Sequence, residues 1–176
     1  LEEAYVKAIS ELAYKTAKES SSLRIAYSAL HGVGQRLFMK TLNVNGYHTV
    51  FPVITQETPD AKFPTLSSPN PEDPKALELA LSVAKKNECD LVLVNDPDAD
   101  RLGVAVRTQN GRFKILNGNE IGSLLSYYIL SQKKVKKPLI VSTIVSSRIV
   151  PKIAASFQAR YSETWTGFKW IMKEAM

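Results

Sequence analysis

Three aspartates stand at alternate positions, Asp96, Asp98 and Asp100, directly after the strand-like run Leu91–Asn95 and directly before Arg101. Carboxylates this close together raise each other's pKa unless a cation neutralises them. Their oxygens suit the hard cations Mg²⁺, Ca²⁺ and Mn²⁺, and no histidine or cysteine pattern nearby favours zinc. The spacing therefore predicts a divalent-metal site, with a solvated acidic turn as the alternative.

The same spacing occurs in EF-hand loops, which carry carboxylates at their first, third and fifth positions. An EF-hand also requires glycine at the sixth position, glutamate at the twelfth and helices on both sides. Arg101 and Arg107 occupy those two positions here, and strands are expected on both sides. The EF-hand interpretation therefore fails.

Arg101 has a chemical use beside such a metal. A guanidinium next to a metal-binding carboxylate cluster is well shaped to hold a phosphate through two hydrogen bonds. The alternative is an internal salt bridge to Asp98 or Asp100, and the two roles can coexist. A metal together with an arginine is typical of phosphoryl transfer, in which the protein positions groups and neutralises charge.

Hydrophobic spacing indicates which elements position this loop. Helical and strand-like segments alternate along the chain, which is typical of an α/β fold with parallel crossovers. The expected order is a helix over 1–19, a strand over 23–30, a helix over 35–42, a strand over 47–54, a proline-rich loop over 55–74, a helix over 75–87, and strands over 90–95, 102–107 and 113–116. Residues that follow a buried strand of such a sheet project into the ligand crevice, where we expect the aspartates.

These elements predict a three-layer α/β/α sandwich. Its mixed, mostly parallel four-stranded sheet is expected to end in an antiparallel hairpin around Asn110 and Gly111. Asn119 is expected to cap the helix that closes this first domain, residues 1–135. A second, incomplete α/β unit is expected over residues 136–176, with a strand, a helix and a short strand over 139–144, 147–157 and 161–164.

The composition is that of a soluble globular protein, since 44% of the 176 residues are hydrophobic, 23% are charged and the formal net charge is +6. No apolar run reaches the roughly 18–20 residues that cross a bilayer, so we expect no membrane partner. The basic run 133–137 lacks aromatic side chains for stacking on bases, which predicts a solvated linker and no nucleic-acid partner. The single cysteine, Cys89, favours a reducing cytoplasm, and the first residue, Leu1, favours a piece of a longer protein.

Two further segments contain polar residues whose roles are open. The run from His31 to Gly34 follows a strand and precedes a helix, as a phosphate-binding turn does, but Leu37 replaces the third glycine of a dinucleotide fingerprint. We therefore favour glycines that permit tight strand-to-helix packing and keep His31 as a candidate that lines the crevice. Asn70 and Glu72 of the proline-rich loop either face the cleft or cap the following helix.

Five motifs, in order along nearly the whole chain, resemble those of the α-D-phosphohexomutases, the phosphoglucomutase and phosphomannomutase superfamily. They are SALHGVG, FPTLSSPNPEDP, VNDPDADRLGVA, NGNEIGSLL and TWTGFKWI. The third resembles the family's metal-binding loop, whose commoner form is DGDGDR. The combination of DPDADR with TGFKW is most similar to the phosphoglucomutase-2 or phosphopentomutase-like branch.

The resemblance implies a reaction and a set of site residues. Members transfer a phosphate from a phosphoserine to a sugar phosphate, form a bisphosphorylated sugar and take back the other phosphate. It implies that the three aspartates bind Mg²⁺ and that Arg101 is a catalytic residue that contacts phosphate. It also places Thr166, Gly167 and Lys169 near the substrate, although Lys169 as an ordinary surface residue at a helix start is the alternative.

Other family motifs are missing from this sequence. Neither the serine nucleophile motif nor the sugar-specificity loop is found, so we expect a metal-binding piece, domain II with the start of domain III, that is inactive without the remaining domains of its parent chain. The expected partners are a phosphosugar and its bisphosphate, with a hexose or a pentose equally compatible. The alternatives are a haloacid-dehalogenase-like phosphatase, with the first aspartate as nucleophile, and a non-catalytic anion-binding module.

Overall fold

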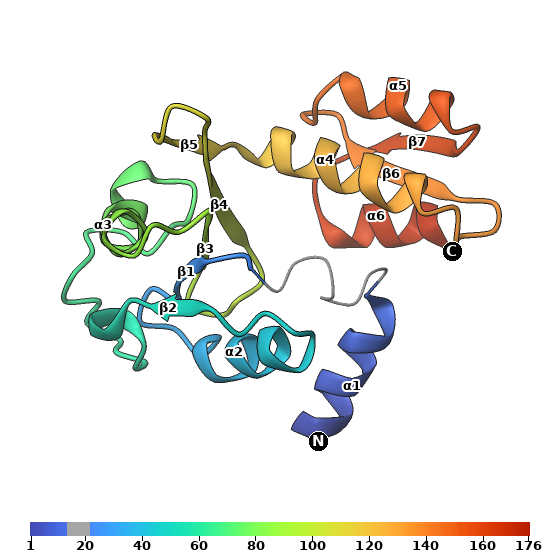
Figure 1. Ribbon diagram of the computed structural model, residues 1–176. Coiled ribbons are helices and arrows are strands. Elements are labelled where there is room, and N and C mark those ends of the chain that lie inside the picture. The colour runs from blue at the N-terminus through green and yellow to red at the C-terminus, as the bar shows by residue number, and fades with distance from the viewer. Residues whose placement is uncertain (14–21) are drawn as a thin grey trace. The chain divides into compact units, whose positions relative to one another are not determined.

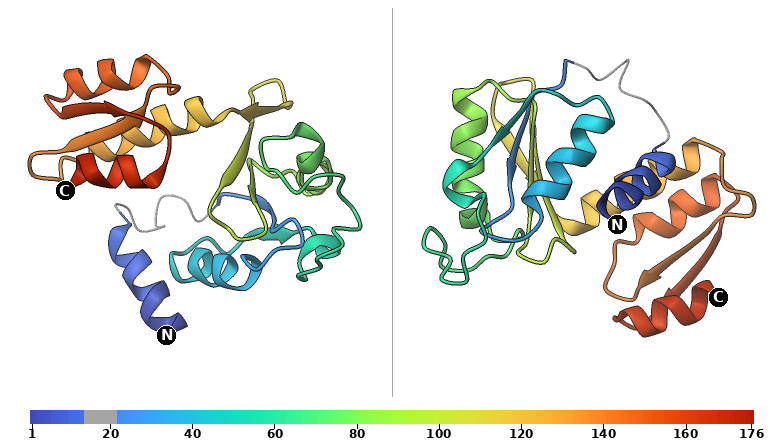
Figure 2. Two further views of the ribbon diagram at one scale, coloured as in Figure 1. Left: turned by 180° about the vertical axis from the view of Figure 1, so that it is seen from behind. Right: turned by 90° about the horizontal axis from the view of Figure 1, so that it is seen from below.

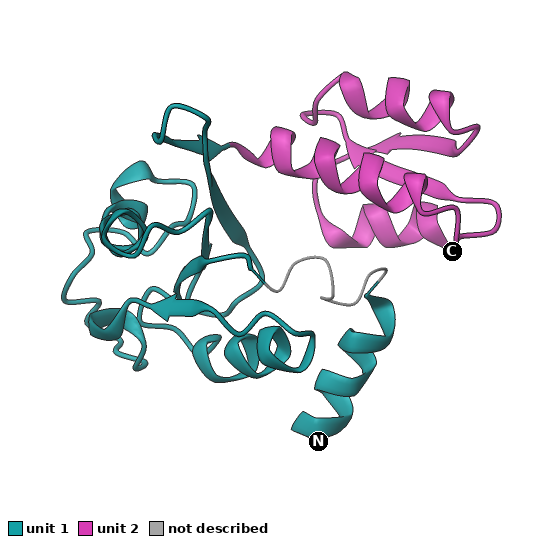
Figure 3. Cartoon of the chain, viewed as in Figure 1, with its two compact units in different colours: residues 1–116 teal, residues 117–176 magenta. Residues whose placement is uncertain are grey.

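The computed structural model describes residues 1–13 and 22–176 (Figure 1). The chain forms two compact units, residues 1–116 and 117–176 (Figure 3), and each is described by itself. The helix expected over 1–19 is observed as α1, Glu2–Leu12, and the part of that prediction that falls on residues 14–21 lies outside the described residues. Among the described residues, none of the helices is both long and apolar enough to cross a membrane.

Unit 1 alternates helices and strands in the expected order. After α1 come β1 (Ile25–Ser28), α2 (Gln35–Val44), β2 (Val50–Pro52), the short 3-10 helices η2 (Ile54–Gln56) and η3 (Pro74–Leu77), α3 (Glu78–Lys86), β3 (Leu91–Asn95), β4 (Leu102–Arg107) and β5 (Phe113–Leu116). The strands β4 and β5 have the bounds that the sequence predicts. The first two strands are shorter than expected, and Pro52, which lacks a backbone N–H, lies in β2 at the edge of the sheet.

The sheet of unit 1 has the strand order β2-β1-β3-β4-β5. The pairs β1–β2 and β1–β3 are parallel, and the pairs β3–β4 and β4–β5 are antiparallel. The α/β class and the closing hairpin are confirmed. The sheet has five strands instead of the four expected, because both hairpin strands join the three strands of the parallel part.

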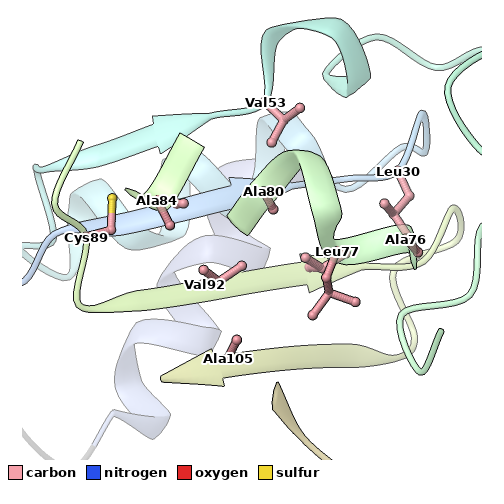
Figure 4. Close-up of a cluster of buried hydrophobic side chains, with 11 residues drawn as sticks. Leu30, Val53, Ala76, Leu77, Ala80, Ala84, Cys89, Val92 and Ala105 are labelled. Carbon is pink, nitrogen blue, oxygen red and sulfur yellow. The ribbon is translucent and has the colours of Figure 1, made fainter. Parts of the chain in front are cut away.

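Helices cover both faces of this sheet. Figure 2 shows α3 and α2 against opposite faces, which gives the three-layer arrangement expected from the sequence. On the α3 side, small residues at helical spacing, Ala76, Ala80 and Ala84, let η3 and α3 approach the strands closely (Figure 4). Val92 lies beneath them, and Cys89 is buried in the same cluster as a small apolar group.

Unit 2 contains α4 (Gly118–Ser131), β6 (Leu139–Thr143), α5 (Ile149–Ser156), β7 (Arg160–Thr164) and α6 (Phe168–Ala175). Its sheet consists of β6 and β7, which are parallel. Within this unit, α4 and α5 lie on one side of the strands and α6 on the other (Figure 2). We expected the helix that is now α4 to close a first domain of residues 1–135, but α4 packs against α5 and the second unit begins at residue 117.

The start of α4 differs from the prediction by two residues. Asn117, not Asn119, caps the helix: its side chain accepts from the Glu120 backbone N–H at 2.9 Å, and the Glu120 carboxylate accepts from the Asn117 N–H at 3.0 Å. This reciprocal pair requires a glutamate three residues after the cap, which only Asn117 has. Asn119 instead accepts from the backbone N–H of Ser147 at 2.8 Å.

Candidate metal centre

The aspartates lie in the tight turn that joins β3 to β4. The turn is closed at its centre by a hydrogen bond from the Ala99 N–H to the Asp96 carbonyl oxygen at 3.0 Å. Ala99 has a φ of 62°, in the left-handed region that side chains other than glycine rarely adopt. The backbone reverses sharply here, and one oxygen from each of Asp96, Asp98 and Asp100 lies within 4.8 Å of the other two.

The three carboxylates differ in their surroundings. Asp96 is 1% exposed, whereas Asp98 and Asp100 are exposed to solvent. Asp96 accepts two hydrogen bonds from Arg101, one from the backbone N–H to Oδ1 at 2.9 Å and one from Nε to Oδ2 at 2.7 Å. The internal salt bridge was expected with Asp98 or Asp100. The one with Asp100 is present at 3.7 Å from Nε, but the shorter ion pair from the same Nε is with Asp96, at 2.7 Å.

These contacts shift the pKa values of Asp96 and Asp100 in opposite directions. Burial by itself would raise the pKa of Asp96, but the backbone and side-chain hydrogen bonds from Arg101 outweigh burial, and the pKa lies below its ordinary value. Shared hydrogen bonding with Asp96 and the nearby charge of Asp98 raise the pKa of Asp100. One guanidinium thus compensates the buried carboxylate and leaves uncompensated negative charge at the exposed end of the turn.

A hard divalent cation fits this donor set. All the candidate ligands are carboxylate oxygens, which Mg²⁺ and Ca²⁺ prefer, and the described residues around them contribute no cysteine or histidine to the cluster. The raised pKa of Asp100 indicates repulsion that a bound cation would relieve.

A buried chain of side chains fixes the base of the turn. The Tyr27 hydroxyl donates to Asn95 Oδ1 at 3.2 Å, and Asn95 Nδ2 donates to the Arg101 carbonyl oxygen at 2.7 Å. Tyr27 stacks on Phe38 of α2 with ring centroids 4.2 Å apart, and burial raises the pKa of its hydroxyl. Neither Tyr27 nor Asn95 was predicted as a site residue, because both occupy positions that read as ordinary strand residues.

The glycine-containing turn after β1 packs directly against the aspartate turn. A Cβ added to Gly32 would lie 2.3 Å from the Cα of Pro97, a separation that no side chain tolerates. The Val33 N–H donates to the Pro97 carbonyl oxygen at 2.8 Å, so the two turns are also hydrogen-bonded. Close backbone approach therefore explains the glycine here, in agreement with the interpretation of tight packing.

His31 lies in the turn after β1 and is buried. It is 5% exposed, and its Nε2 is 2.8 Å from the Thr65 hydroxyl of the proline-rich loop. Gln56 donates to the same hydroxyl at 2.9 Å and accepts from Ser28 at 2.7 Å. His31 therefore belongs to a polar network that holds the proline-rich loop to β1, and its expected place near the substrate stays a prediction.

The proline-rich loop contacts the end of the aspartate turn through Asn70. Asn70 Oδ1 accepts from Arg101 Nη1 at 3.1 Å and from the Glu72 backbone N–H at 3.1 Å. The helix-capping role belongs to Asp73, which accepts from the Lys75 N–H at 3.0 Å. The sequence left Asn70 undecided between two roles, and in the structure its side chain contacts Arg101 and does not cap the following helix.

A cleft of about 410 Å³ opens beside the aspartate turn within unit 1. Its walls are mostly apolar side chains from α1 and α2, including Ile9 and Leu37, and its polar edge is formed by Asn95 and Asp98. Mostly apolar walls with a few placed polar groups are usual for ligand-binding clefts.

The remaining predicted site residues lie in unit 2, where β7 leads into α6. Thr166 and Lys169 are exposed, and Gly167 is the N-cap residue of α6. Lys169 Nζ lies 5.2 Å from the centroid of the Trp170 ring, a cation–π contact on the surface of the unit. Lys169 thus lies at the start of a helix, a position compatible both with a contact to substrate and with an ordinary surface residue.

Comparisons with known proteins agree with this division of the chain. Residues 3–111 match the family described as phosphoglucomutase/phosphomannomutase, alpha/beta/alpha domain II, and residues 117–176 match domain III of the same description. The second match begins at residue 117, which is also the first residue of the second compact unit.

Individual proteins resemble the chain along most of its length. A probable phosphomannomutase of Haemophilus influenzae is 39% identical over 171 residues, 97% of this chain and 35% of that protein. A phosphopentomutase of Mus musculus is 34% identical over 92% of this chain and 28% of that protein. The crystal structure of a putative phosphomannomutase from Thermus thermophilus is 25% identical, covers 99% of this chain and 38% of that one, and has a TM-score of 0.77. The chain spans about a third of the length of these relatives.

Proposed function

Since the chain belongs to the phosphoglucomutase/phosphomannomutase family, with the sequences of domains II and III in order, we propose that it forms the metal-binding part of a phosphosugar mutase. The proposed reaction is a Mg²⁺-dependent interconversion of a sugar 1-phosphate and 6-phosphate, or of pentose 1- and 5-phosphates, through a phosphoserine and a bisphosphate intermediate. The names of the relatives include both hexose and pentose enzymes, so the proposal covers both sugar classes. The proposal also includes a cytoplasmic location for the protein.

The observation that carries the proposal is the arrangement of charge in the aspartate turn. Three carboxylates within 4.8 Å of one another are compensated on one side only, by Arg101. Asp96, Asp98 and Asp100 would hold Mg²⁺ on the other side, and the bound ion would neutralise charge on a transferring phosphoryl group.

Arg101 would act on the same phosphoryl group as the catalytic residue of this segment. Its Nε and Nη1 are engaged by Asp96 and Asn70, and among the described residues we find no hydrogen bond from Nη2. A guanidinium held by a carboxylate oxygen at Nε and by an amide oxygen at Nη1 presents its remaining N–H groups in fixed directions, which is what phosphate recognition requires.

Thr166, Gly167 and Lys169 complete the proposal as substrate-binding residues of unit 2. The serine nucleophile and the sugar-specificity loop would be supplied by the other domains of a parent chain. The greater length of the relatives supports that division of labour, since this chain covers only 35% of the first of them.

The burial and hydrogen bonds of Asp96 disfavour the alternative of a haloacid-dehalogenase-like phosphatase. That mechanism needs the first aspartate as a free nucleophile, but both Asp96 oxygens accept from Arg101 and its side chain is 1% exposed. A non-catalytic anion-binding module would bind nucleic acid with a strong dependence on salt concentration, and that measurement would support it.

The proposal is tested by metal removal from the complete protein that contains this sequence. Chelation should abolish interconversion of glucose, mannose or ribose monophosphates, and added Mg²⁺ should restore it. Asp98→Asn should lower kcat by roughly 100-fold or more, since it removes an anionic ligand from the centre. The matched control is Asp60→Asn, at a half-buried aspartate whose side chain caps a turn by accepting from the Lys62 N–H. Full activity in Asp98→Asn would refute the assignment.

A further inference from the structure

We propose that Asn70 is a positioning residue that sets the direction of the Arg101 guanidinium and thereby tunes phosphate transfer. The inference rests on the proposed function and deepens it, because it adds a residue from the proline-rich loop to the machinery around Arg101. The observation is a single hydrogen bond, 3.1 Å from Arg101 Nη1 to Asn70 Oδ1, between residues 31 positions apart in the chain.

The geometry gives this bond a directional role. Asp96 fixes the inner edge of Arg101 by accepting from its backbone N–H and from Nε. Nη1 lies beyond Nε on the planar group, so a bond at Nη1 stops rotation about the long, partly exposed side chain. Two fixed nitrogens determine the plane of the guanidinium, and the two N–H groups of Nη2 then donate in fixed directions within that plane.

Asn70 is itself held firmly. Its Oδ1 also accepts from the Glu72 N–H, and its carbonyl oxygen accepts from the Asp73 N–H at 3.0 Å. It stands between Pro69 and Pro71, whose rings restrict the backbone on both sides. The amide oxygen therefore reaches Arg101 from a turn that is already ordered.

The loop is also seated on the sheet beside the metal centre. A Cβ added to Gly103 of β4 would lie 2.7 Å from the Pro71 carbonyl oxygen, so the glycine permits this approach. Gly103 allows the proline-rich loop to pack closely against β4, and Asn70 of that loop accepts a hydrogen bond from Arg101, the residue that precedes β4.

A neutral amide suits this position better than a carboxylate. An aspartate would bind Arg101 more strongly but would add a fourth negative charge beside the cluster of three and oppose an incoming phosphate. The Asn70 amide accepts the hydrogen bond and leaves the positive charge of Arg101 available to the substrate.

The test is a double-mutant cycle in the complete protein. Asn70→Ala should lower kcat about tenfold with a smaller change in KM, because a misdirected guanidinium costs more in the transition state than in substrate binding. In an Arg101→Lys background the same Asn70→Ala change should cost less than about twofold, since a lysine keeps the charge but lacks the second nitrogen that reaches Asn70. The control is Asp73→Ala, which removes a similar turn-capping bond from the same loop without touching Arg101.

Crystal structures of the wild type and of Asn70→Ala provide a readout that does not depend on activity. The guanidinium of Arg101 should move away from its wild-type direction while Asp96 and the loop backbone stay in place. The inference is overturned if Arg101 keeps its direction in Asn70→Ala, or if Asn70→Ala costs as much in the Arg101→Lys background as in the wild type. Absence of mutase activity in the wild type would refute the proposed function, and the crystal structures would still decide whether Asn70 positions Arg101.

Discussion

Each of the two units contains a parallel pair of strands joined by a helix, but the first strand of the pair is buried to a different extent in each. In unit 1, β1–α2–β2 is a parallel pair joined by a helix, and in unit 2, β6–α5–β7 is another. All four residues of β1 are buried, whereas no residue of β6 is, although its sequence LIVST is at least as apolar as IAYS. β1 lies between β2 and β3 and has one helix layer on each face, while β6 pairs with β7 alone among the strands of the described residues. Burial of a strand therefore depends on its neighbours as much as on its composition.

The loops that carry the proposed chemistry also differ in how many contacts hold them within their own unit. In unit 1, the turns after β1 and β3 are joined by the Val33–Pro97 hydrogen bond and by the contact at Gly32. In unit 2, Thr166 and Lys169 lie on an exposed surface. We infer that the candidate metal centre is preorganised by its own unit, and the following substitutions test that comparison.

The largest effect is expected for Gly32→Ala. The new methyl group would collide with the Pro97 backbone, so we expect a loss of roughly 3 kcal/mol in the stability of unit 1 and weakened Mg²⁺ binding. The matched change in unit 2 is Gly122→Ala, where a Cβ meets nothing within 4 Å. It lies inside α4, and alanine there should stabilise the helix by about 0.5–1 kcal/mol. Segment-resolved hydrogen exchange measures both, and unchanged protection in Gly32→Ala would contradict the close packing.

An intermediate effect is expected for Tyr27→Phe. It removes the buried hydrogen bond to Asn95 and leaves the amide oxygen unpaired, which should cost about 1–2 kcal/mol and raise the dissociation constant for Mg²⁺. The counterpart in unit 2 is Tyr161→Phe, whose hydroxyl lies 2.8 Å from Ser142 in a half-buried place. That change should cost less than about 0.5 kcal/mol. Denaturant unfolding and calorimetric metal titration distinguish the two, and equal costs would argue against a special role of the Tyr27–Asn95 chain.

The smallest effect is expected for Ala99→Gly. Glycine would relieve the strain of the positive φ at this position, but it would also increase the conformational entropy of the unfolded chain. The two terms are each roughly 1 kcal/mol, so we expect a net change in unfolding free energy within about 0.5 kcal/mol. Mg²⁺ affinity should be unchanged within a factor of about two, because the carboxylates keep their places. A large loss of affinity would show that the alanine side chain shapes the centre.

Several features of the fold could be predicted because they depend on residues close together in the chain. The hairpin β4–β5 has its predicted bounds because the turn at Asn110 and Gly111 and the alternating strands are local signals. The cap of α4 was assigned to the wrong asparagine although its signal is local too: only Asn117 has a glutamate three residues later, and the prediction relied on an asparagine alone. The boundary of the units was also placed too late, because the packing of α4 against α5 is a contact that helical periodicity does not specify.

The sequence by itself determined the chemistry of the site: three carboxylates and an arginine in one short turn are brought together by covalent connection, wherever the rest of the chain lies. Only the tertiary structure decided what holds them. Asn70 is 31 positions from Arg101 and Tyr27 is 68 from Asn95, so both bonds require the proline-rich loop, β1 and β3 to be in place first. Hydrogen bonds act over about 3 Å, and a sequence does not state which distant residues will come that close.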